Sequence, residues 1–189
     1  MWKETDIDYI DIDLRSEFEN LSKQFSLKVL LVRRNMNTRC KCYNPLNHDG
    51  DSSCKICGGS GHINTIEQVK TINQNITSME TIKLTEMGLS AMNTVVFYFD
   101  HKTAPRVQDR IFIVGYDSQG LPIDIKKSCT IVSAMQMRGD GGRLEMYKVY
   151  AKYSPEKIRQ DQKRLNSIPP NHKAKIIKGV KYTWPLDTQ

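Results

Sequence analysis

The chain has 189 residues, of which 39% are hydrophobic and 26% are charged, and its formal net charge is +7. These proportions are ordinary for a protein with a buried core, built as one domain with appendages or as two small domains. No run approaches the roughly 18 consecutive apolar residues of a membrane-spanning helix, and the acidic start lacks the features of a signal peptide. We therefore expect no membrane partner and a reducing compartment.

Charge is distributed unevenly along the chain. Residues 3–13 contain one Lys and five acidic residues, whereas residues 152–181 contain nine Lys or Arg and two acidic residues. A basic C-terminal segment suits an acidic protein surface or a phosphate backbone. The alternative interpretation is a solvated, partly disordered tail.

The N-terminal region, residues 1–35, predicts an arm, an amphipathic helix and a first strand. The apolar residues of segment 11–26 recur at offsets of four, three and four, namely Leu14, Phe18, Leu21 and Phe25. This spacing traces one stripe along an α-helix, with Asp11 or Asp13 as the N-cap. We expect the stripe to pack against the protein's own domain. The run LKVLLVRRN that follows has the length and apolar character of a strand.

Residues 36–63 contain four of the five cysteines, as the pairs Cys40-x-Cys42 and Cys54-x-x-Cys57. Two close pairs separated by a loop can place four thiolates tetrahedrally around Zn²⁺. The glycines that follow Cys57 suit a chain that must turn sharply beside a metal. The spacing therefore predicts a metal set of Cys40, Cys42, Cys54 and Cys57 with structural Zn²⁺ as the cofactor.

Three other interpretations of these cysteines stay open: a disulfide or redox pair, a catalytic zinc, and metal-free thiols. Reducing conditions disfavour the first, and four cysteines leave no open coordination position for the second. The side chains of His48, Asp49 or His62 could replace one ligand, although each is typical of an exposed loop. Cys129 lies in a strand pattern and is expected to be a small buried apolar residue.

The sequence pattern of residues 64–154 predicts a β domain. Residues 64–87 predict one or two edge strands because β-branched and polar residues alternate there. Four further strands, separated by Gly and Pro turns, are predicted at 94–99, 110–116, 128–137 and 143–153. Short strands at this spacing are typical of a small antiparallel barrel or sandwich.

The strand pattern does not continue into residues 155–189, which are predicted to form a basic C-terminal arm. Segment 156–165 has the composition of a short polar helix, and the rest suggests an extended arm kinked at Pro169-Pro170. The predicted partner-binding residues of this arm are Lys173, Lys175, Lys178, Lys181, Tyr182 and Trp184. The whole sequence thus predicts a mainly β protein with an N-terminal helix, a small antiparallel β-barrel or sandwich, a zinc-stapled loop module and an extended C-terminal arm.

The segment CKICGGSG, residues 54–61, matches the CxxCxGxG unit of the J-protein chaperone cysteine-rich domain, but that family carries four such units and this chain has one. The order of parts over residues 14–153 resembles instead the neck proteins of tailed bacteriophages, the head-completion or head-to-tail connector proteins. Its elements are the amphipathic helix, a strand ending in Arg33-Arg34, the cysteine cage with its glycine-rich end, and β-strands joined by the P-x-x-x-D-R-I step at residues 105–111.

The resemblance implies a structural virion protein at the neck, assembled in the host cytoplasm, that forms a homo-oligomeric ring joining the head to the tail. Its partners would be other neck proteins and the portal and tail rings, with transient contact with packaged DNA. It implies no catalytic residues, and the sequence shows no GxSxG, Walker or HExxH motif, so we expect no enzyme activity. The alternative is a zinc-ribbon, OB-like nucleic-acid-binding protein. The basic segment and the tyrosines Tyr98 and Tyr116 support this alternative.

Overall fold

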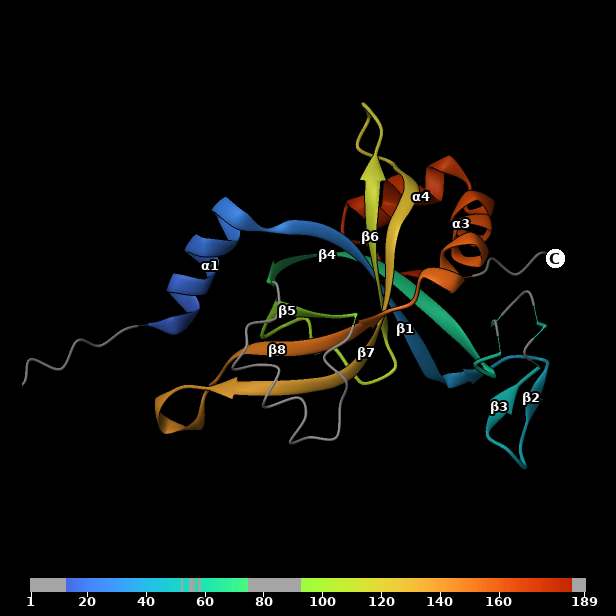
Figure 1. The fold of residues 1–189 in the computed structure, drawn as a ribbon, viewed down its shortest axis with the longest axis horizontal. Helices are drawn as coiled ribbons and strands as arrows, with labels where there is room; N and C mark the ends of the chain where they lie inside the picture. Colours follow the sequence, from blue (N-terminus) through green and yellow to red (C-terminus); the bar gives the residue numbers. More distant parts are fainter. Residues whose placement is uncertain (1–12, 52, 55–56, 58, 75–92, 185–189) are drawn as a thin grey trace, which may run out of the picture.

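The computed structural model describes residues 13–51, 53–54, 57, 59–74 and 93–184 (Figure 1). It is mainly β, with a helix at its N-terminal end, as the sequence predicted. The helix α1 spans Leu14–Phe25, and its N-cap is Asp13, whose carboxylate accepts a hydrogen bond from the Arg15 backbone N–H at 3.3 Å. This cap satisfies one of the amide groups that the first helical turn leaves unpaired.

Six long strands form one antiparallel sheet. In chain order they are β1 (Leu27–Arg39), β4 (His62–Gln74), β5 (Thr94–Asp100), β6 (Arg110–Tyr116), β7 (Pro122–Arg138) and β8 (Leu144–Tyr153). Their spatial order is β1-β6-β7-β8-β5-β4, and β4 also pairs with β1, so the hydrogen-bonded pairs form a closed circuit. A short strand β9 (Tyr182–Trp184) adds to the free half of β4.

Strand β1 is buried on both faces. Val29 and Leu31 belong to a core cluster with residues of β5, β6, β7 and β8. The alternate residues Leu30 and Val32 belong to a second cluster, on the opposite face, with β4, β6, β7 and the C-terminal helices. Since neighbouring side chains of a strand point to opposite faces, the continuous apolar run of β1 reflects this double burial.

The strand predictions hold for most of the β region. β5, β6 and β8 match the predicted segments, and β7 begins at Pro122, six residues before the predicted start at Ser128. The early part of β7 is polar, IDIKK, and its ladder to β6 contains irregular pairs, so it carried no clear alternation. β4 is not an edge strand along its length, because β1 pairs with one side and β5 and β9 pair with the other. The part of that prediction beyond residue 74 lies outside the described residues.

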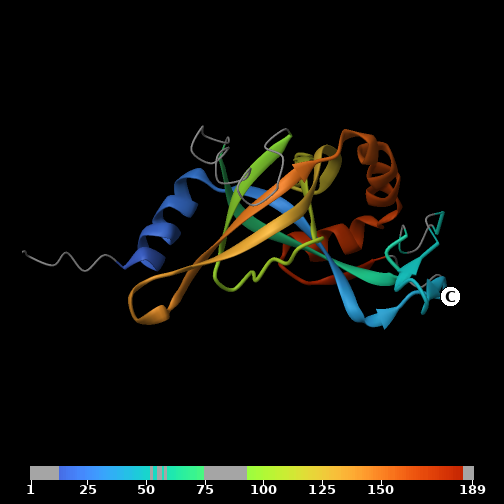
Figure 2. The same ribbon diagram turned by 60° about the horizontal axis from the view of Figure 1, so that its bottom comes forward.

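The extended arm predicted after residue 165 is wrong for residues 170–177, which form a helix. A short 3-10 turn, η2 (Pro155–Lys157), leads into α3 (Ile158–Ser167), and α4 (Pro170–Ile177) follows, so only the short helix at 156–165 was foreseen. Both helices lie on one side of the sheet (Figure 2). Leu165, Ile168 and Ile176 are at most 3% exposed in the core cluster beneath them. This segment is therefore part of the folded core.

The burial of α3 was not predicted because of Asp161. Positions 158, 161 and 165 form one stripe of α3, and the acidic residue within it makes the stripe look polar. In the structure Asp161 is fully buried, accepts a hydrogen bond from the Ser128 hydroxyl at 3.0 Å, and forms an ion pair with Arg110. A buried carboxylate needs such partners, and the sequence alone does not reveal a partner so far along the chain.

The expectation that α1 packs its apolar stripe against its own domain is only partly met. Phe18 is buried, but Leu14, Leu21 and Phe25 are 41%, 49% and 65% exposed. Polar contacts attach the first turn of the helix to β8, since the Arg15 guanidinium donates to the Leu144 carbonyl at 2.6 Å and lies 3.3 Å from the Glu145 carboxylate. Most of the amphipathic face of α1 is therefore available to a partner.

Candidate metal centre

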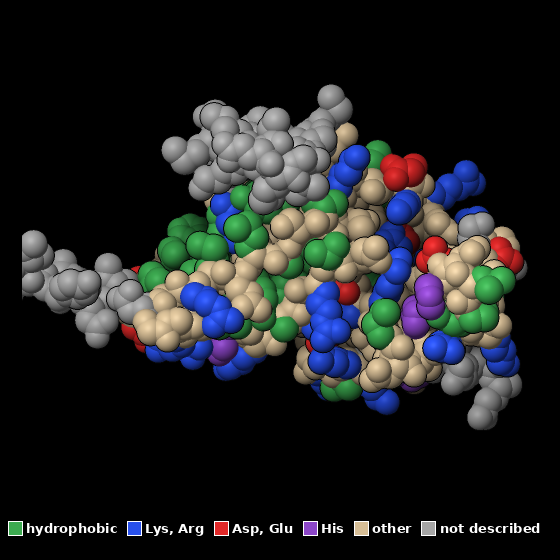
Figure 3. Space-filling view, turned by 90° about the horizontal axis from the view of Figure 1, so that it is seen from below, with side chains coloured by type: hydrophobic (Ala, Val, Ile, Leu, Met, Phe, Trp, Pro, Cys, Tyr) green, Lys and Arg blue, Asp and Glu red, His purple; other side chains and the backbone are tan. Residues whose placement is uncertain are grey.

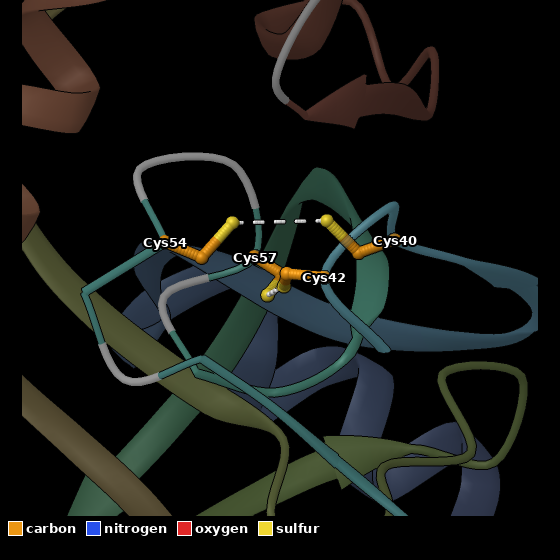
Figure 4. Close-up of side chains that lie close together, drawn as sticks. All are labelled: Cys40, Cys42, Cys54 and Cys57. Atoms are coloured by element: carbon orange, nitrogen blue, oxygen red, sulfur yellow. Dashed lines mark hydrogen bonds between the residues drawn. The ribbon is translucent and has the colours of Figure 1, made fainter. Parts of the chain in front are cut away.

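Two loops bring four cysteines together at one end of the β1–β4 pair. Cys40 and Cys42 follow the end of β1, and Cys54 and Cys57 lie between the short strands β2 (Tyr43–Asn44) and β3 (Asp49–Gly50) and the start of β4. After a register shift beyond Arg34, the strand pair closes with Arg39 opposite His62, so the two loops meet. Figure 4 shows the four side chains converging.

The sulfur positions suit a tetrahedral metal site. All four Sγ atoms lie within 4.8 Å of one another, with 3.8 Å between Cys40 and Cys54 and 3.3 Å between Cys42 and Cys57. A tetrahedron with zinc–sulfur bonds of about 2.3 Å has sulfur–sulfur edges of about 3.8 Å. The five cysteines form no disulfide. The cluster could therefore bind a metal ion.

Burial makes these thiols hard to ionise by themselves. It raises the pKa of Cys42 to about 12, and the neighbouring thiols of Cys57 and Cys54 add to the rise. Burial likewise raises the pKa of Cys40, which is 4% exposed. A bound cation reverses this effect because it stabilises the thiolates. A cation that binds the four sulfur atoms would therefore displace the thiol protons.

Glycine permits the close packing of the two loops. A Cβ atom on Gly50 would lie 2.6 Å from the Gly61 backbone nitrogen and 3.0 Å from the Cys42 sulfur. Gly61 has φ +68, and a Cβ there would lie 2.9 Å from the Asp49 backbone carbon. The loops are also joined by backbone hydrogen bonds, from Gly50 N–H to the Gly59 carbonyl at 3.0 Å and from Cys40 N–H to the Gly61 carbonyl at 2.9 Å.

We expect Gly61→Ala to weaken metal binding at least about tenfold, because the added methyl group separates the two ligand loops. The matched control is Gly120→Ala in the β6–β7 turn. Gly120 has a similar φ of +76, but nothing lies within 4 Å of an added Cβ. Both variants carry the left-handed strain of about 1 kcal/mol, and only the first carries the clash. Competition with a chromogenic chelator measures the affinity, and equal affinities in the two variants would contradict the expected role of Gly61.

The other residues considered as ligands have different surroundings. The His48 ring nitrogen lies 2.9 Å from the Tyr43 hydroxyl and is exposed. His62 is 6% exposed, and its ring packs edge-on against Tyr43 with centroids 5.3 Å apart. Among the described residues, neither histidine nor Asp49 joins the four cysteines within ligand distance. Cys129 is fully buried in the core of the sheet, as predicted.

The structure does not gather the predicted partner-binding residues at the tip of an arm. Lys173 and Lys175 lie on α4, and burial lowers the pKa of Lys173. Lys178 and Lys181 are exposed after the helix, with the Lys181 ammonium 3.8 Å from the Glu67 carboxylate. In β9 the backbone of Tyr182 pairs with Ile66 and that of Trp184 with Asn64. Their side chains lie outside the described residues.

A second polar feature next to the cysteines was missed in the sequence. Arg34, Arg110 and Arg164 come from β1, β6 and α3 and line one pocket together with Cys57. The nearby pair Arg33-Arg34 was noticed only as the end of a strand. Nothing in the sequence indicates that residue 164 would lie beside residues 34 and 110, because the C-terminal helices were not expected to fold back over the sheet.

Within the described ranges, none of the helices is both long and apolar enough to cross a membrane. Comparison of the sequence with protein-family models gives no match, and comparison with curated proteins gives none either.

Proposed function

We propose that this chain is a structural virion protein of the tailed-bacteriophage neck, which forms a homo-oligomeric ring between the head and the tail. Its partners in this role are the portal and tail rings and other neck proteins. The observation that carries the proposal is the exposed stripe of α1, because an amphipathic helix that leaves Leu21 and Phe25 about half or more exposed in one chain gains stability when a neighbouring subunit covers it.

The rest of the fold supports a building block of this kind. We propose that the closed circuit of strands acts as the small barrel found in such ring proteins, with its interior filled by the cluster around Phe97 and Phe99. A ring subunit must be rigid, and a metal-linked pair of loops adds rigidity where few apolar side chains are buried.

We propose further that the metal is Zn²⁺ in a structural role. Four sulfur donors in a tetrahedral arrangement are typical of zinc or of iron–sulfur chemistry. Four protein ligands fill the zinc coordination shell, which favours structure over catalysis. Elemental analysis of the purified chain tests this proposal: about one zinc per chain supports it, whereas iron in that amount would overturn it.

The α1 stripe provides the direct test of the neck role. The double variant Leu21→Asp, Phe25→Asp should fold with an unchanged melting temperature, because both side chains are already exposed in the single chain. It should be excluded from phage particles, because two carboxylates would be buried at the subunit contact. Immunoblotting of purified particles, made in cells in which the variant replaces the natural chain, measures incorporation.

The matched control is Leu46→Asp, an 87% exposed apolar residue in the cysteine loops. This variant should enter particles normally. Electron microscopy of particles that lack the chain should show heads without attached tails. Particles with joined heads and tails in its absence would overturn the proposed function.

A further inference from the structure

A pocket of about 390 Å³ lies between the cysteine loops, the sheet and α3. Its cationic lining residues come from four elements and are Arg34 of β1, Arg110 of β6, Lys157 of η2 and Arg164 of α3. The amides of Gln108 and Gln160 line it as well, and no Asp or Glu among the described residues does. Such a lining favours an anionic ligand with several oxygen atoms.

Asp161 and a zinc-loaded cluster of four thiolates, whose net charge would be −2, balance only part of the positive charge of the four cationic residues. The buried carboxylate of Asp161 pairs with Arg110 and lies 4.0 Å from the Arg164 guanidinium, so one negative charge serves two guanidinium groups. Within the described residues, Nε of Arg110 and Nη2 of Arg164 are buried without a hydrogen-bond partner. Buried donors of this kind are normally paired, and both side chains also line the pocket.

The sequence contains a segment of matching charge before α1. The described chain starts at Asp13, next to α1, and the cysteine loops and α3 lie at the other end (Figures 1 and 2). In the residues before it, Glu4, Asp6 and Asp8 recur at every second position. In an extended strand, such residues project to the same side at intervals of about 7 Å.

We propose that the cationic pocket binds residues 4–8 of a second copy of this chain, with the three carboxylates paired to the guanidinium and ammonium groups of the pocket. The segment precedes α1, which lies at the end of the molecule away from the pocket. The contact therefore joins unlike surfaces of two copies, and repetition of one such heterologous contact generates a ring where the rotation closes. Lys and Arg outnumber Asp and Glu on the face shown in Figure 3, which would steer an acidic segment toward the molecule. The proposal deepens the homo-oligomeric ring proposed above and rests on it.

The experiment measures binding of a fluorescein-labelled peptide of residues 1–13 to the metal-loaded full chain by fluorescence anisotropy. We expect saturable binding that weakens with added salt. The variant Arg34→Glu, Lys157→Glu should weaken it at least about tenfold, because two attractive contacts become repulsive. Lys102→Glu, Lys126→Glu, which changes two exposed residues outside the pocket lining, is the matched control and should leave the affinity nearly unchanged.

A second peptide, with its charges reversed, tests whether binding depends on charge complementarity. The form with Glu4→Lys, Asp6→Lys and Asp8→Lys should not bind the natural chain, and it should bind the Arg34→Glu, Lys157→Glu variant, since the charges are then complementary again. Equal binding of both peptides to the natural chain would overturn the proposal. Failure of the peptide to bind while α1 variants still lose incorporation into particles would reject this contact and leave the neck role standing.

Two further outcomes would assign the pocket another role and overturn the proposal. A single-stranded oligonucleotide that binds in the pocket and is not displaced by excess peptide would make it a phosphodiester site. If Arg164→Met weakened metal binding and left peptide binding unchanged, the guanidinium groups would serve the cysteine cluster alone. Unchanged metal binding together with weaker peptide binding in Arg164→Met would support the proposal.

Discussion

A chain that ends at Ser154 is expected to unfold, although the sequence pattern suggested that its last residues were an appendage. The truncation removes Leu165, Ile168 and Ile176 from the core and exposes their partners Leu30, Phe112 and Ile125. The loss of one buried Leu or Ile side chain costs about 2–5 kcal/mol, and a domain of this size is stable by only about 5–15 kcal/mol. Circular dichroism and urea denaturation of the truncated chain measure the outcome.

A single substitution gives a graded form of the same test. Leu165→Ala should lower the free energy of unfolding by about 2–5 kcal/mol, whereas Leu46→Ala, at an 87% exposed position, should change it by about 0.5 kcal/mol or less. A truncated chain with native circular dichroism and a cooperative transition would show that the two C-terminal helices are dispensable to the core.

The variant Cys54→Ser, Cys57→Ser is expected to lose its metal and much of its stability. Two ligands remain, too few to hold the ion. At a free zinc concentration about a thousand times the dissociation constant, an ion bound only by the folded state contributes about 4 kcal/mol. Cys129→Ala, which leaves all four sulfur ligands in place, is the control and should keep full metal content. Metal analysis and thermal unfolding with and without a chelator provide the measurements.

Proton release gives a separate check on the same site. Burial and the neighbouring thiols raise the pKa of Cys42 to about 12 and raise that of Cys40, so both thiols are protonated near pH 7 before metal binds. Metal uptake must then release protons, and affinity should rise with pH. Titration in a weakly buffered solution detects the protons. Metal binding to the natural chain without proton release would contradict a thiolate site.

The features that could be read from the sequence are those with local signals. The helix stripe from Leu14 to Phe25, the alternation in β5 and β8, and the two cysteine pairs each depend on residues close in the chain. The structure brings the four cysteines within metal-binding distance because β1 and β4 pair as far as Arg34 opposite Asn64 and, after an irregularity, again at Arg39 opposite His62. The spacing of the four cysteines in the sequence was enough to predict them as one metal-binding set.

The features that could not be predicted depend on contacts between distant segments. Asp161 looks like a surface residue until Arg110 and Ser128 are seen beside it. The exposure of Phe25 likewise depends on the position of the sheet relative to α1. The apolar pattern of the helix does not predict that position. The cationic pocket combines residues 34, 110 and 164, and only the folded C-terminal helices bring them together.

The cysteine loops are the connection between β1 and β4, so the cluster stands at the turn of one long hairpin. Both arms of this hairpin are complete once the ribosome has released residues 1–74, about two fifths of the chain, well before β6 and the C-terminal helices emerge. An ion captured at that stage shortens the effective loop and lowers the entropy loss of bringing the arms together. It also fixes which residues face each other across them. A metal bound at that stage would therefore hold β1 and β4 together before β5 and β6 pair with them.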